Sequence, residues 1–356
     1  MAIEWLAGNR IRGTSTERTS TSGFNQISAI SGGWKEVGRT TLSSHSSNIS
    51  VSSLPDKRYY MILYDAIAKA TGGSDNNWRF NGDSGNNYAH RKQVNGASDS
   101  TGTNQSKIYN MESGGSRHEF GVNYLTNKSD KEKLMIGNNV INWTSGASGD
   151  ASRKEIVSKW TNTSDSIDEV QLHYSSGRAE ANSEVVVLGW DPSDSHTTNF
   201  WEELASVDLS GGANANLSSG SFSAKKYLWL QYYVQATSGG PDLKVTFNND
   251  TGTNYTRRRS INGGSDATNT GQSGLDQDGS LVNLFVNAFI INNSSNEKLG
   301  IFNSVREDAS GASNAPNRRE TATKWVNTSS QITEIDLDVS SSTMTTSSYM
   351  RVWGSN

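Results

Sequence analysis

Residues 80–88 read FNGDSGNNY, and residues 247–255 read FNNDTGTNY, 167 positions later. When the next eight residues are included, nine of seventeen positions are identical between the two copies. A second pair, KWTNTSDSIDEVQL at 159–172 and KWVNTSSQITEIDL at 324–337, shares eight of fourteen positions at a spacing of 165. Because the matched segments keep their order along the chain, the sequence indicates a tandem duplication of one unit.

The duplicated unit defines the predicted domains, residues 34–195 and 196–356. Its period is far longer than that of a solenoid repeat, so each unit is expected to fold around its own core. Residues 1–33 have no counterpart in the second unit. Their Gly, Ser and Thr content is typical of a disordered tail or of an extended arm that orders against a neighbouring subunit. The candidate assembly residues of this arm are Trp5, Leu6, Arg10 and Arg12.

The composition is polar, yet it differs from that of a disordered chain. Hydrophobic residues make up 33% of the sequence, but charged residues make up only 19% and the formal net charge is −4. The chain also has 10 Trp, 12 Tyr and 9 Phe, whose side chains bury large apolar areas. This combination favours many short strands with polar outer faces around thin cores.

Several classes of protein are excluded by what the sequence lacks. The absence of cysteine excludes disulfides, a thiol nucleophile and Cys-based zinc sites. The nearly neutral charge provides no basic surface for nucleic acid. No segment reaches the roughly 18 apolar residues of a membrane span, and the first residues lack the basic and apolar regions of a secretory signal. We therefore expect neither nucleic acid nor a membrane as partner.

The apolar patterns are those of strands. The segment EIDLDV (334–339) alternates, which places its apolar side chains on one face of a sheet. The run EVVVLGW (184–190) is continuously apolar, as expected for a strand buried on both faces. The segment SRKEIVSKW (152–160) also fits a short capped helix, but its counterpart NRRETATKW (317–325) is rich in Thr, so both are interpreted as strands. The predicted fold is all-β, with two tandem, duplicated jelly-roll β-sandwich domains behind an N-terminal extended arm.

The repeated phrase is interpreted as a structural turn between two strands. Phe and Tyr anchor the strands, Asn and Asp bond nearby backbone N–H groups, and Gly supplies a positive φ. The motif residues are Phe80, Asn81, Asp83, Gly85 and Tyr88, with the counterparts Phe247, Asn248, Asp250, Gly252 and Tyr255. Arg91 and its counterpart Arg258 are candidate partners of the aspartate. The Asn-Gly pair that ends each copy, at 95–96 and 262–263, predicts a type I′ hairpin.

A calcium loop is the alternative interpretation of the phrase. Asn81, Asp83 and Asn87 carry oxygen donors at alternating positions, and calcium takes six to eight oxygens. However, the spacing is not that of an EF-hand, and each loop has a single carboxylate. A structural turn is therefore favoured, and no metal or other cofactor is expected.

The pattern F-N-x-D-[ST]-G-x-N-Y, followed by EKL and by the strand KW-x-NTS, resembles modules in virion structural proteins of tailed phages and marine viruses. Those modules are similar to lectin-like, concanavalin-like jelly rolls. The resemblance covers each unit from about residue 57 to its end. It implies a non-enzymatic protein that is assembled in the host cytoplasm, resides in the virion, and decorates capsids, builds fibres or contacts host glycans. It supplies no catalytic residues.

The search for catalytic groups identifies little. None of the five histidines recurs at the matching position of the other unit. A glycosidase needs two carboxylates across a cleft, and the acidic pairs that recur are Glu132 and Glu297, Glu155 and Glu320, and Glu169 and Glu334. For sugar binding, the aromatic residues without an aromatic counterpart are the candidates for stacking on a ligand, namely Trp78 and Trp143.

Three functions follow from these observations. The first is a virion structural protein (a capsid-associated, decoration or coat subunit) that contacts copies of itself or other virion proteins. The alternative is a lectin-like module of a fibre or adhesin that binds host surface glycans. The third and weakest is a carbohydrate-active enzyme, and we expect the protein not to be an enzyme.

Overall fold

The computed structural model describes residues 30–31, 33–69, 75–110, 116–196, 198–237, 242–278, 283–307 and 309–356. All regular elements in these residues are strands, which confirms the predicted all-β class. None of the described residues belongs to a helix that is long and apolar enough to cross a membrane. The candidate assembly residues Trp5, Leu6, Arg10 and Arg12 lie outside the described residues.

The first module is a sandwich of a large and a small antiparallel sheet. The large sheet has the order β2-β14-β4-β9-β10-β11-β6-β7, with β13 also paired to β4, and the small sheet has the order β3-β12-β5-β8. Strands from the start of the module pair with strands from its end. In the large sheet β2 and β4 flank β14 and β6 pairs with β11, and in the small sheet β3 and β5 flank β12. This strand order is that of a jelly roll. The strands are β2 (Lys35–Thr41), β3 (Asn48–Val51), β4 (Tyr59–Lys69), β5 (Asn76–Phe80), β6 (Tyr88–Val94), β7 (Ser100–Gln105), β8 (Ile108–Tyr109), β9 (Arg117–Thr126), β10 (Lys133–Asn142), β11 (Ser152–Trp160), β12 (Val170–Tyr174), β13 (Arg178–Ala179) and β14 (Glu184–Trp190).

The second module repeats this topology, except that no strand corresponding to β13 is found in its described residues. Its large sheet has the order β16-β27-β18-β23-β24-β25-β20-β21, and its small sheet has the order β17-β26-β19-β22. The strands are β16 (Glu202–Asp208), β17 (Asn216–Ser218), β18 (Tyr227–Gln235), β19 (Leu243–Phe247), β20 (Tyr255–Ile261), β21 (Ala267–Gln272), β22 (Leu275–Asp278), β23 (Asn283–Ile291), β24 (Lys298–Glu307), β25 (Asn317–Trp325), β26 (Ile335–Val339) and β27 (Tyr349–Ser355). Between the modules, β1 (Ile30–Ser31) pairs with β15 (Ser195–His196). The predicted tandem β-sandwich is confirmed.

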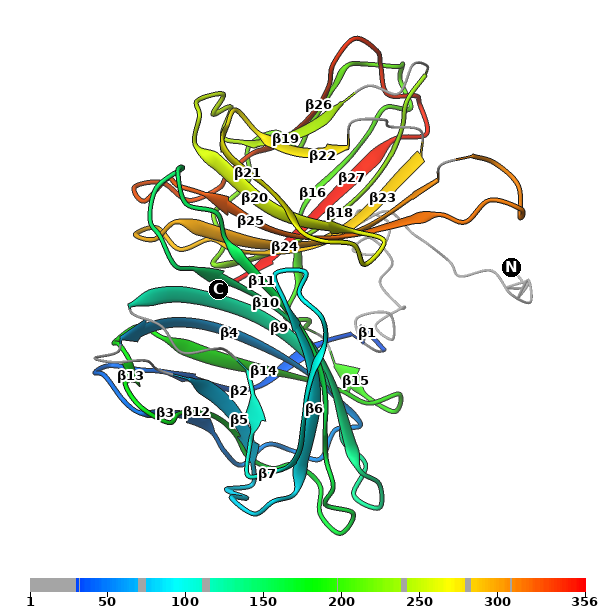
Figure 1. Cartoon of the computed structure of the whole chain (residues 1–356). Coiled ribbons are helices and arrows are strands. Elements are labelled where there is room, and N and C mark those ends of the chain that lie inside the picture. Colours follow the sequence, from blue (N-terminus) through cyan, green and yellow to red (C-terminus); the bar gives the residue numbers. More distant parts are fainter. Residues whose placement is uncertain are drawn as a thin grey trace, which may run out of the picture.

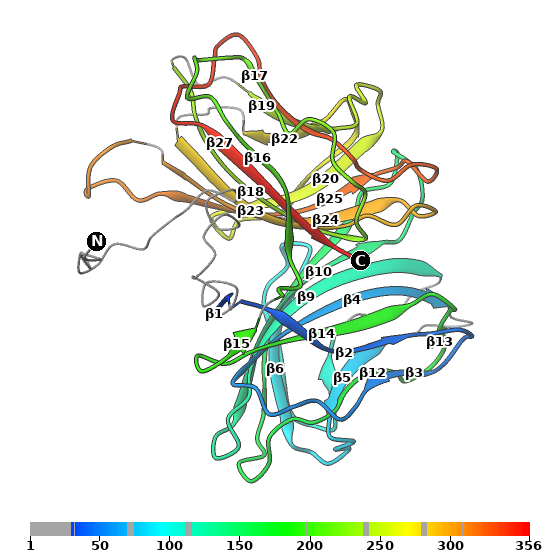
Figure 2. The ribbon, with the colours of Figure 1, turned by 180° about the vertical axis from the view of Figure 1, so that it is seen from behind.

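The two large sheets face each other in the middle of the molecule, and the small sheets lie at its opposite ends (Figures 1 and 2). One apolar core fills each sandwich, and a third lies between the two large sheets. The position of β14 explains why its sequence is continuously apolar. Val185 and Val187 belong to the core of the first sandwich, whereas Val186 and Leu188 belong to the core between the modules. The prediction that this strand is buried on both faces is confirmed, and the covering layer on the second face is the other module.

The repeated phrase forms the same turn in both modules, although one detail of the prediction is wrong. The positive φ angles fall at Asn81 (52°) and Gly82 (65°), not at Gly85. A Cβ at Gly85 would lie 2.9 Å from the side-chain nitrogen of Asn87, so a larger residue there would displace the Asn87 side chain. The predicted turn bond is confirmed, since Gly85 N donates to Asp83 Oδ1 at 2.8 Å.

The aspartate of the motif binds a tryptophan from a neighbouring strand. Trp160 Nε1 donates to Asp83 Oδ2 at 2.6 Å, and in the second module Trp325 Nε1 donates to Asp250 Oδ2 at 2.7 Å. The predicted arginine partner is wrong, because Arg91 pairs with Asp99 instead. Arg91 lies three residues after the buried Tyr88, so the alternation of the strand turns it to the opposite face.

The Asn-Gly hairpins agree with the prediction. Asn95 and Gly96 have φ angles of 52° and 72°, and Asn262 and Gly263 have 54° and 73°. Two successive positive φ angles define the type I′ turn, whose twist matches that of the paired strands. Each turn lies in the connection between β6 and β7 or between β20 and β21, and the ladder beyond it is offset by one residue, with Lys92 opposite Ser100 and Arg259 opposite Ala267.

We expect Asp250→Asn to lower the free energy of unfolding of the second module by about 1.5–3 kcal/mol near pH 7, the range for hydrogen bonds to charged groups. Burial raises the pKa of Asp250, but hydrogen bonds from Trp325, Asn254 and Gly252 outweigh it and leave the pKa below its usual value. A lowered pKa stabilises the fold above the ordinary aspartate pKa, and this stabilisation is lost as the pH falls through the folded-state value. Urea unfolding at pH 7 and pH 2 measures the effect, with the exposed Asp242→Asn as control. An Asp250→Asn defect of equal size at both pH values contradicts this account.

Candidate functional site: the outer faces of the large sheets

The two modules are joined by an apolar contact between the outer faces of their large sheets. The first module contributes side chains from β4, β9, β10 and β14, and the second contributes side chains from β18, β23, β24 and β25. The buried members are Met61, Leu63, Phe120, Val122, Val140, Ala151, Val186, Leu188, Phe200, Trp201, Tyr227, Phe289, Ile291, Leu299, Ile301 and Ala322. Phe200 and Trp201 come from the segment that leads into the second module, so the connection itself is part of the contact.

A buried ion pair lies beside this apolar contact. Lys324 Nζ is 3.1 Å from Glu297 Oε2, with side-chain exposures of 0% and 7%. Lys324 Nζ also donates to Thr144 O at 2.6 Å and to Gly146 O at 2.8 Å, both in the loop between β10 and β11. Glu297 in turn accepts bonds from Asn142 Nδ2 at 2.6 Å and from Gly146 N at 2.5 Å. The loop of the first module thus covers an ion pair of the second. Burial lowers the pKa of Lys324, and the nearby Glu297 opposes this effect.

A second polar cluster closes another side of the contact. His118 Nε2 lies 2.6 Å from Asp65 Oδ1, and Lys226 Nζ lies 3.2 Å from Asp65 and 3.1 Å from Glu184. Tyr227 OH donates to Glu184 Oε1 at 2.7 Å. Burial raises the pKa of Asp65, but the hydrogen bond and charge of His118 and the charge of Lys226 outweigh it, so the pKa is lowered. The second module therefore supplies a cation to two carboxylates of the first.

Two patches on the same outer faces remain uncovered. The first patch lies on β10 and β11 and consists of Leu134, Ile136 and Val157, with exposures of 55%, 58% and 49%. It borders a hollow of about 520 Å³. The second patch lies on β23, β24 and β27 and consists of Phe285, Val305 and Tyr349, with exposures of 38%, 42% and 39%. These six are the large apolar side chains that are exposed in the described part of the chain.

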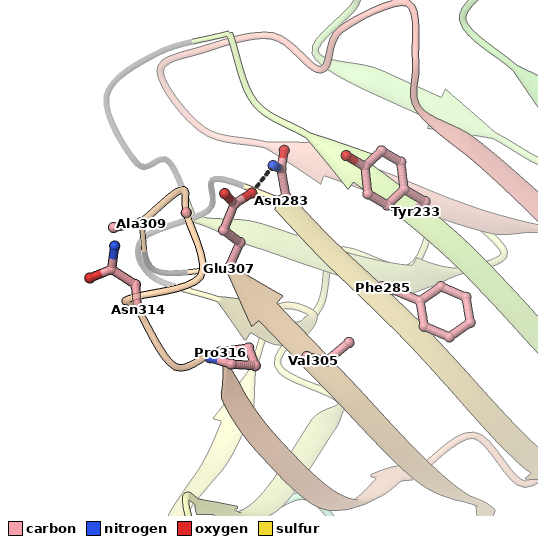
Figure 3. Close-up of a pocket in the computed structure, with 9 residues that line it drawn as sticks. Tyr233, Asn283, Phe285, Val305, Glu307, Ala309, Asn314 and Pro316 are labelled. Atoms are coloured by element: carbon pink, nitrogen blue, oxygen red, sulfur yellow. Dashed lines mark hydrogen bonds between the residues drawn. The ribbon is translucent and has the colours of Figure 1, made fainter.

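The second patch borders a hollow of about 290 Å³ beside the loop between β24 and β25 (Figure 3). Asn283 donates to Glu307 at one end of this hollow, and Pro316 lies opposite. Tyr233 stacks on Tyr349 with ring centres 5.9 Å apart. Burial raises the pKa of Tyr233, and the charge of Glu307 adds to the effect. The hollow therefore combines aromatic faces with amide and carboxylate groups.

The structure contradicts the predicted ligand-stacking role of Trp78. This residue is 0% exposed in the core of the first sandwich, where its ring meets that of Tyr64 edge-on at 5.5 Å. The reason is the alternation of β5, which points Trp78 between the sheets. Trp143 is half-buried, and the guanidinium of Arg117 lies over its ring at 5.0 Å. Its role in ligand stacking stays a prediction, now with one ring face occupied.

One of the recurring acidic pairs, Glu155 and Glu320, comes together between the modules. Glu155 and Glu320 both line a hollow of about 380 Å³ between the modules. Each is also bound by an arginine, Arg153 for Glu155 and Arg318 for Glu320. Among the described residues, no group of three or more His, Cys, Asp and Glu side chains is placed to hold a metal ion. The carboxylate of Asp83, the candidate calcium ligand, is instead bound by Trp160, Asn87 and Gly85.

We expect Glu320→Gln to stabilise the contact between the modules at neutral pH. Burial raises the pKa of Glu320, and the charge of Glu155 raises it further. A carboxyl with a raised pKa stabilises the fold below the ordinary glutamate pKa, and this contribution is lost as the pH rises through the folded-state value. The variant should therefore melt at a higher temperature than wild type at pH 7.5 and at the same temperature near pH 3.5. Scanning calorimetry measures both, and a lower melting temperature at pH 7.5 contradicts the prediction.

Comparisons with known proteins identify no family. No family model matches the chain, and no curated protein matches it. Among solved structures, domains LG4–5 of the mouse laminin alpha1 chain align at 9% identity over 90% of each chain with a TM-score of 0.20. Human GIVD cytosolic phospholipase A2 aligns at 9% identity over 76% of this chain and 33% of that chain with a TM-score of 0.09. The function is therefore argued from the site alone.

Sequence reasoning did not identify the two exposed patches. Leu134 and Ile136 flank the core residue Met135, and Val157 follows the core residue Ile156, so both segments are short apolar runs whose pattern predicts burial on both faces. The only available signal was the duplication, because it aligns each patch with a segment of the other unit. Which of the two aligned segments is covered depends on how the modules pack.

Proposed function

We propose that this chain is a non-enzymatic structural protein that acts through protein–protein assembly contacts made by the outer faces of its large sheets. The observation that carries the proposal is the exposed apolar surface on β10, β11, β23 and β24. Monomeric proteins rarely leave such residues grouped, and grouped apolar residues on a surface mark sites of contact with another protein. Covering them gains roughly 25 cal/mol for each Å² of apolar surface removed from water.

The setting that we propose is a virus particle, in which the chain is a capsid-associated, decoration or coat subunit. Support comes from the resemblance of the motif that starts at Phe80 and Phe247 to modules of virion proteins. The contact between the modules adds support, because the same type of sheet face already binds a second sandwich. The partners would be copies of the chain or other virion proteins.

A glycan-binding module is the second candidate, and one observation favours it. The ring of Tyr233 lies beside Asn283 and Glu307 in the second hollow, and Tyr349 stacks on this ring. Aromatic faces next to amide and carboxylate groups are the combination that lectins use to hold a sugar ring. In this reading the second patch would bind an oligosaccharide instead of a protein.

One set of measurements separates the two candidates. The purified chain is applied to a glycan array, and its mass is followed by light scattering over a range of concentrations. A structural protein is expected to bind no glycan and to associate through the patches. Glycan binding that is lost in Tyr349→Ala but kept in Leu134→Asp would replace the first proposal by the second. Turnover of a polysaccharide that is abolished by Glu155→Gln would overturn both.

A further inference from the structure

The first patch has a buried counterpart in the second module. Aligning EKLMI (132–136) with EKLGI (297–301) makes Leu134 and Ile136 the counterparts of Leu299 and Ile301. In the same register Val157 corresponds to Ala322. Leu299, Ile301 and Ala322 are all buried in the contact between the modules. The surface that the second module uses to bind the first is therefore the surface that the first module leaves exposed. We name it the lysine face, because it also carries Lys324 or its counterpart Lys159.

The second patch also has a buried counterpart. In the first module Phe120 on β9 pairs with Asp65 on β4, and in the second module Phe285 on β23 pairs with Tyr233 on β18. These are equivalent strand positions, so Phe285 is the counterpart of Phe120. Val305 follows Val140 by the same number of residues and is its counterpart. Phe120 and Val140 are buried in the contact between the modules. We name this surface the loop face, because it includes the loop after β10 or the equivalent loop after β24. The contact within the chain thus joins the loop face of the first module to the lysine face of the second.

The loop after β24 already has the conformation that holds the lysine in the first loop. Residues 145–148 and 310–313 both read SGAS. Gly149 N donates to Gly146 O at 3.3 Å, and Asn314 N donates to Gly311 O at 3.1 Å, which closes the same turn. Gly146 and Gly311 both have positive φ, at 82° and 92°. The carbonyl that accepts Lys324 in the first loop therefore has an equivalent at Gly311.

The ion pair on the free lysine face also corresponds to the buried one. Lys159 Nζ lies 2.9 Å from Glu132 Oε2, with exposures of 42% and 41%, whereas its counterpart Lys324–Glu297 is covered by the loop after β10. The loop after β24 points away from the first module of its own chain, so it does not cover Lys159 in this molecule (Figure 1). One chain thus presents a free loop face on one module and a free lysine face on the other.

We propose that copies of this chain bind head to tail, with the loop face of the second module of one copy against the lysine face of the first module of the next. This inference rests on the proposed function and names the partner. Because the two surfaces differ, the contact is heterologous and generates a filament or a closed ring. In the contact Phe285 and Val305 cover Leu134 and Ile136, and the carbonyl of Gly311 accepts Lys159 Nζ.

The contact between copies is weaker than the one within the chain, for two reasons. Arg258 of the second module binds Asp150 in the first loop, but Ala315 occupies the equivalent position of the second loop. In addition, the connection between the modules supplies a high effective concentration that separate chains lack. Assembly is therefore concentration-dependent and reversible, with association expected in the range of about 1–100 μM for a weak, specific contact.

The test uses two substitutions at exposed residues, Ile136→Asp on the lysine face and Val305→Asp on the loop face. Wild type is expected to exceed the 38.6 kDa mass of one chain increasingly as its concentration rises in sedimentation velocity. Each variant alone should stay a monomer, with association weakened at least tenfold. Mixed in equal amounts, the two variants retain one intact face of each kind and should form a dimer and nothing larger. Lys244→Asp, on the outer side of the small sheet in β19, should assemble as wild type does.

Other outcomes overturn the inference. If only one of the two variants prevents association, or if the mixture does not form a dimer, the contact joins like faces and is not head to tail, while the proposed assembly function stands. If wild type stays a monomer at 100 μM, a second copy is not the occupant. If this monomeric protein also binds glycans, both the head-to-tail inference and the proposed assembly function are wrong. If Ile136 and Val305 were shielded from solvent in a monomer, the two patches would be covered within one chain and not by a second copy.

Discussion

Arg117→Met is expected to lower the free energy of unfolding of the first module by about 3–5 kcal/mol, the range for removing one partner of a buried ion pair. Arg117 and Glu119 are both fully buried and are bound to each other on β9. Asn76 on β5 also donates to Glu119, so the carboxylate joins the large sheet to the small one. Without the guanidinium, the carboxylate stays between the sheets with the amide of Asn76 as its donor, and the charge of Lys154 compensates only part of its desolvation.

The pH dependence of this variant has a defined sign. Burial raises the pKa of Glu119, and the charge of Arg117 opposes the effect. Removing the arginine therefore raises the pKa further. A raised pKa means that stability is fully present below the ordinary glutamate pKa and is lost as the pH rises through the folded-state value. The defect of Arg117→Met should accordingly shrink between pH 7 and pH 4 in denaturant titrations.

The second module supplies the control for this prediction. The counterparts of Glu119 and Asn76 are Leu284 and Leu243, which are buried in its apolar core. Replacing a buried ion pair together with its amide partner by apolar residues of similar size is often neutral or stabilising, and the residual cost here is that Asn110, which donates to Asn76, loses its acceptor. The combined variant Asn76→Leu, Arg117→Met and Glu119→Leu should therefore recover most of the stability that Arg117→Met loses. A combined variant that is less stable than the single one would show that the network holds the sheets together in a way that leucines do not.

Lys324→Ala is expected to weaken the contact between the modules by about 3–5 kcal/mol. The lysine is fully buried, and its ammonium group binds Glu297 together with carbonyl groups of the loop after β10. Its removal leaves Glu297 as an unpaired buried carboxylate and leaves the carbonyls of Thr144 and Gly146 without their donor. The loop should separate more readily from the second module, because the buried ion pair is one of its two charged anchors, the other being Arg258 with Asp150.

Lys159→Ala is the matched control for this substitution. Lys159 occupies the equivalent position of the first module and pairs with Glu132 at the surface, where such pairs contribute about 0–1 kcal/mol. Calorimetry on dilute protein should show two separate transitions for Lys324→Ala and a wild-type profile for Lys159→Ala. Limited proteolysis should cut the loop at 143–151 faster in the first variant only. Equal profiles for both variants would show that the ion pair does not hold the modules together.

Much of the fold was predictable because it depends on patterns local to each unit. Alternation along EIDLDV (334–339) and the continuous apolar run EVVVLGW (184–190) predicted strands, and the Asn-Gly pair at 95–96 predicted a hairpin. The motif was identified as a turn, yet the positive φ lies at Asn81 and Gly82 because the chain reverses immediately after Phe80. The partner of Asp83 was missed because Trp160 is 77 residues away in sequence.

The sequence by itself determined that one β-sandwich occurs twice, since matched order, alternation and turn residues are properties of each unit alone. Only the tertiary structure decided which faces meet. Leu134 and Leu299 belong to the same repeated EKL segment, but one is exposed and the other is buried. The physical reason is that burial of a sheet face depends on the layer placed against it, and a single contact between two duplicated modules covers one loop face and one lysine face while leaving the others in water.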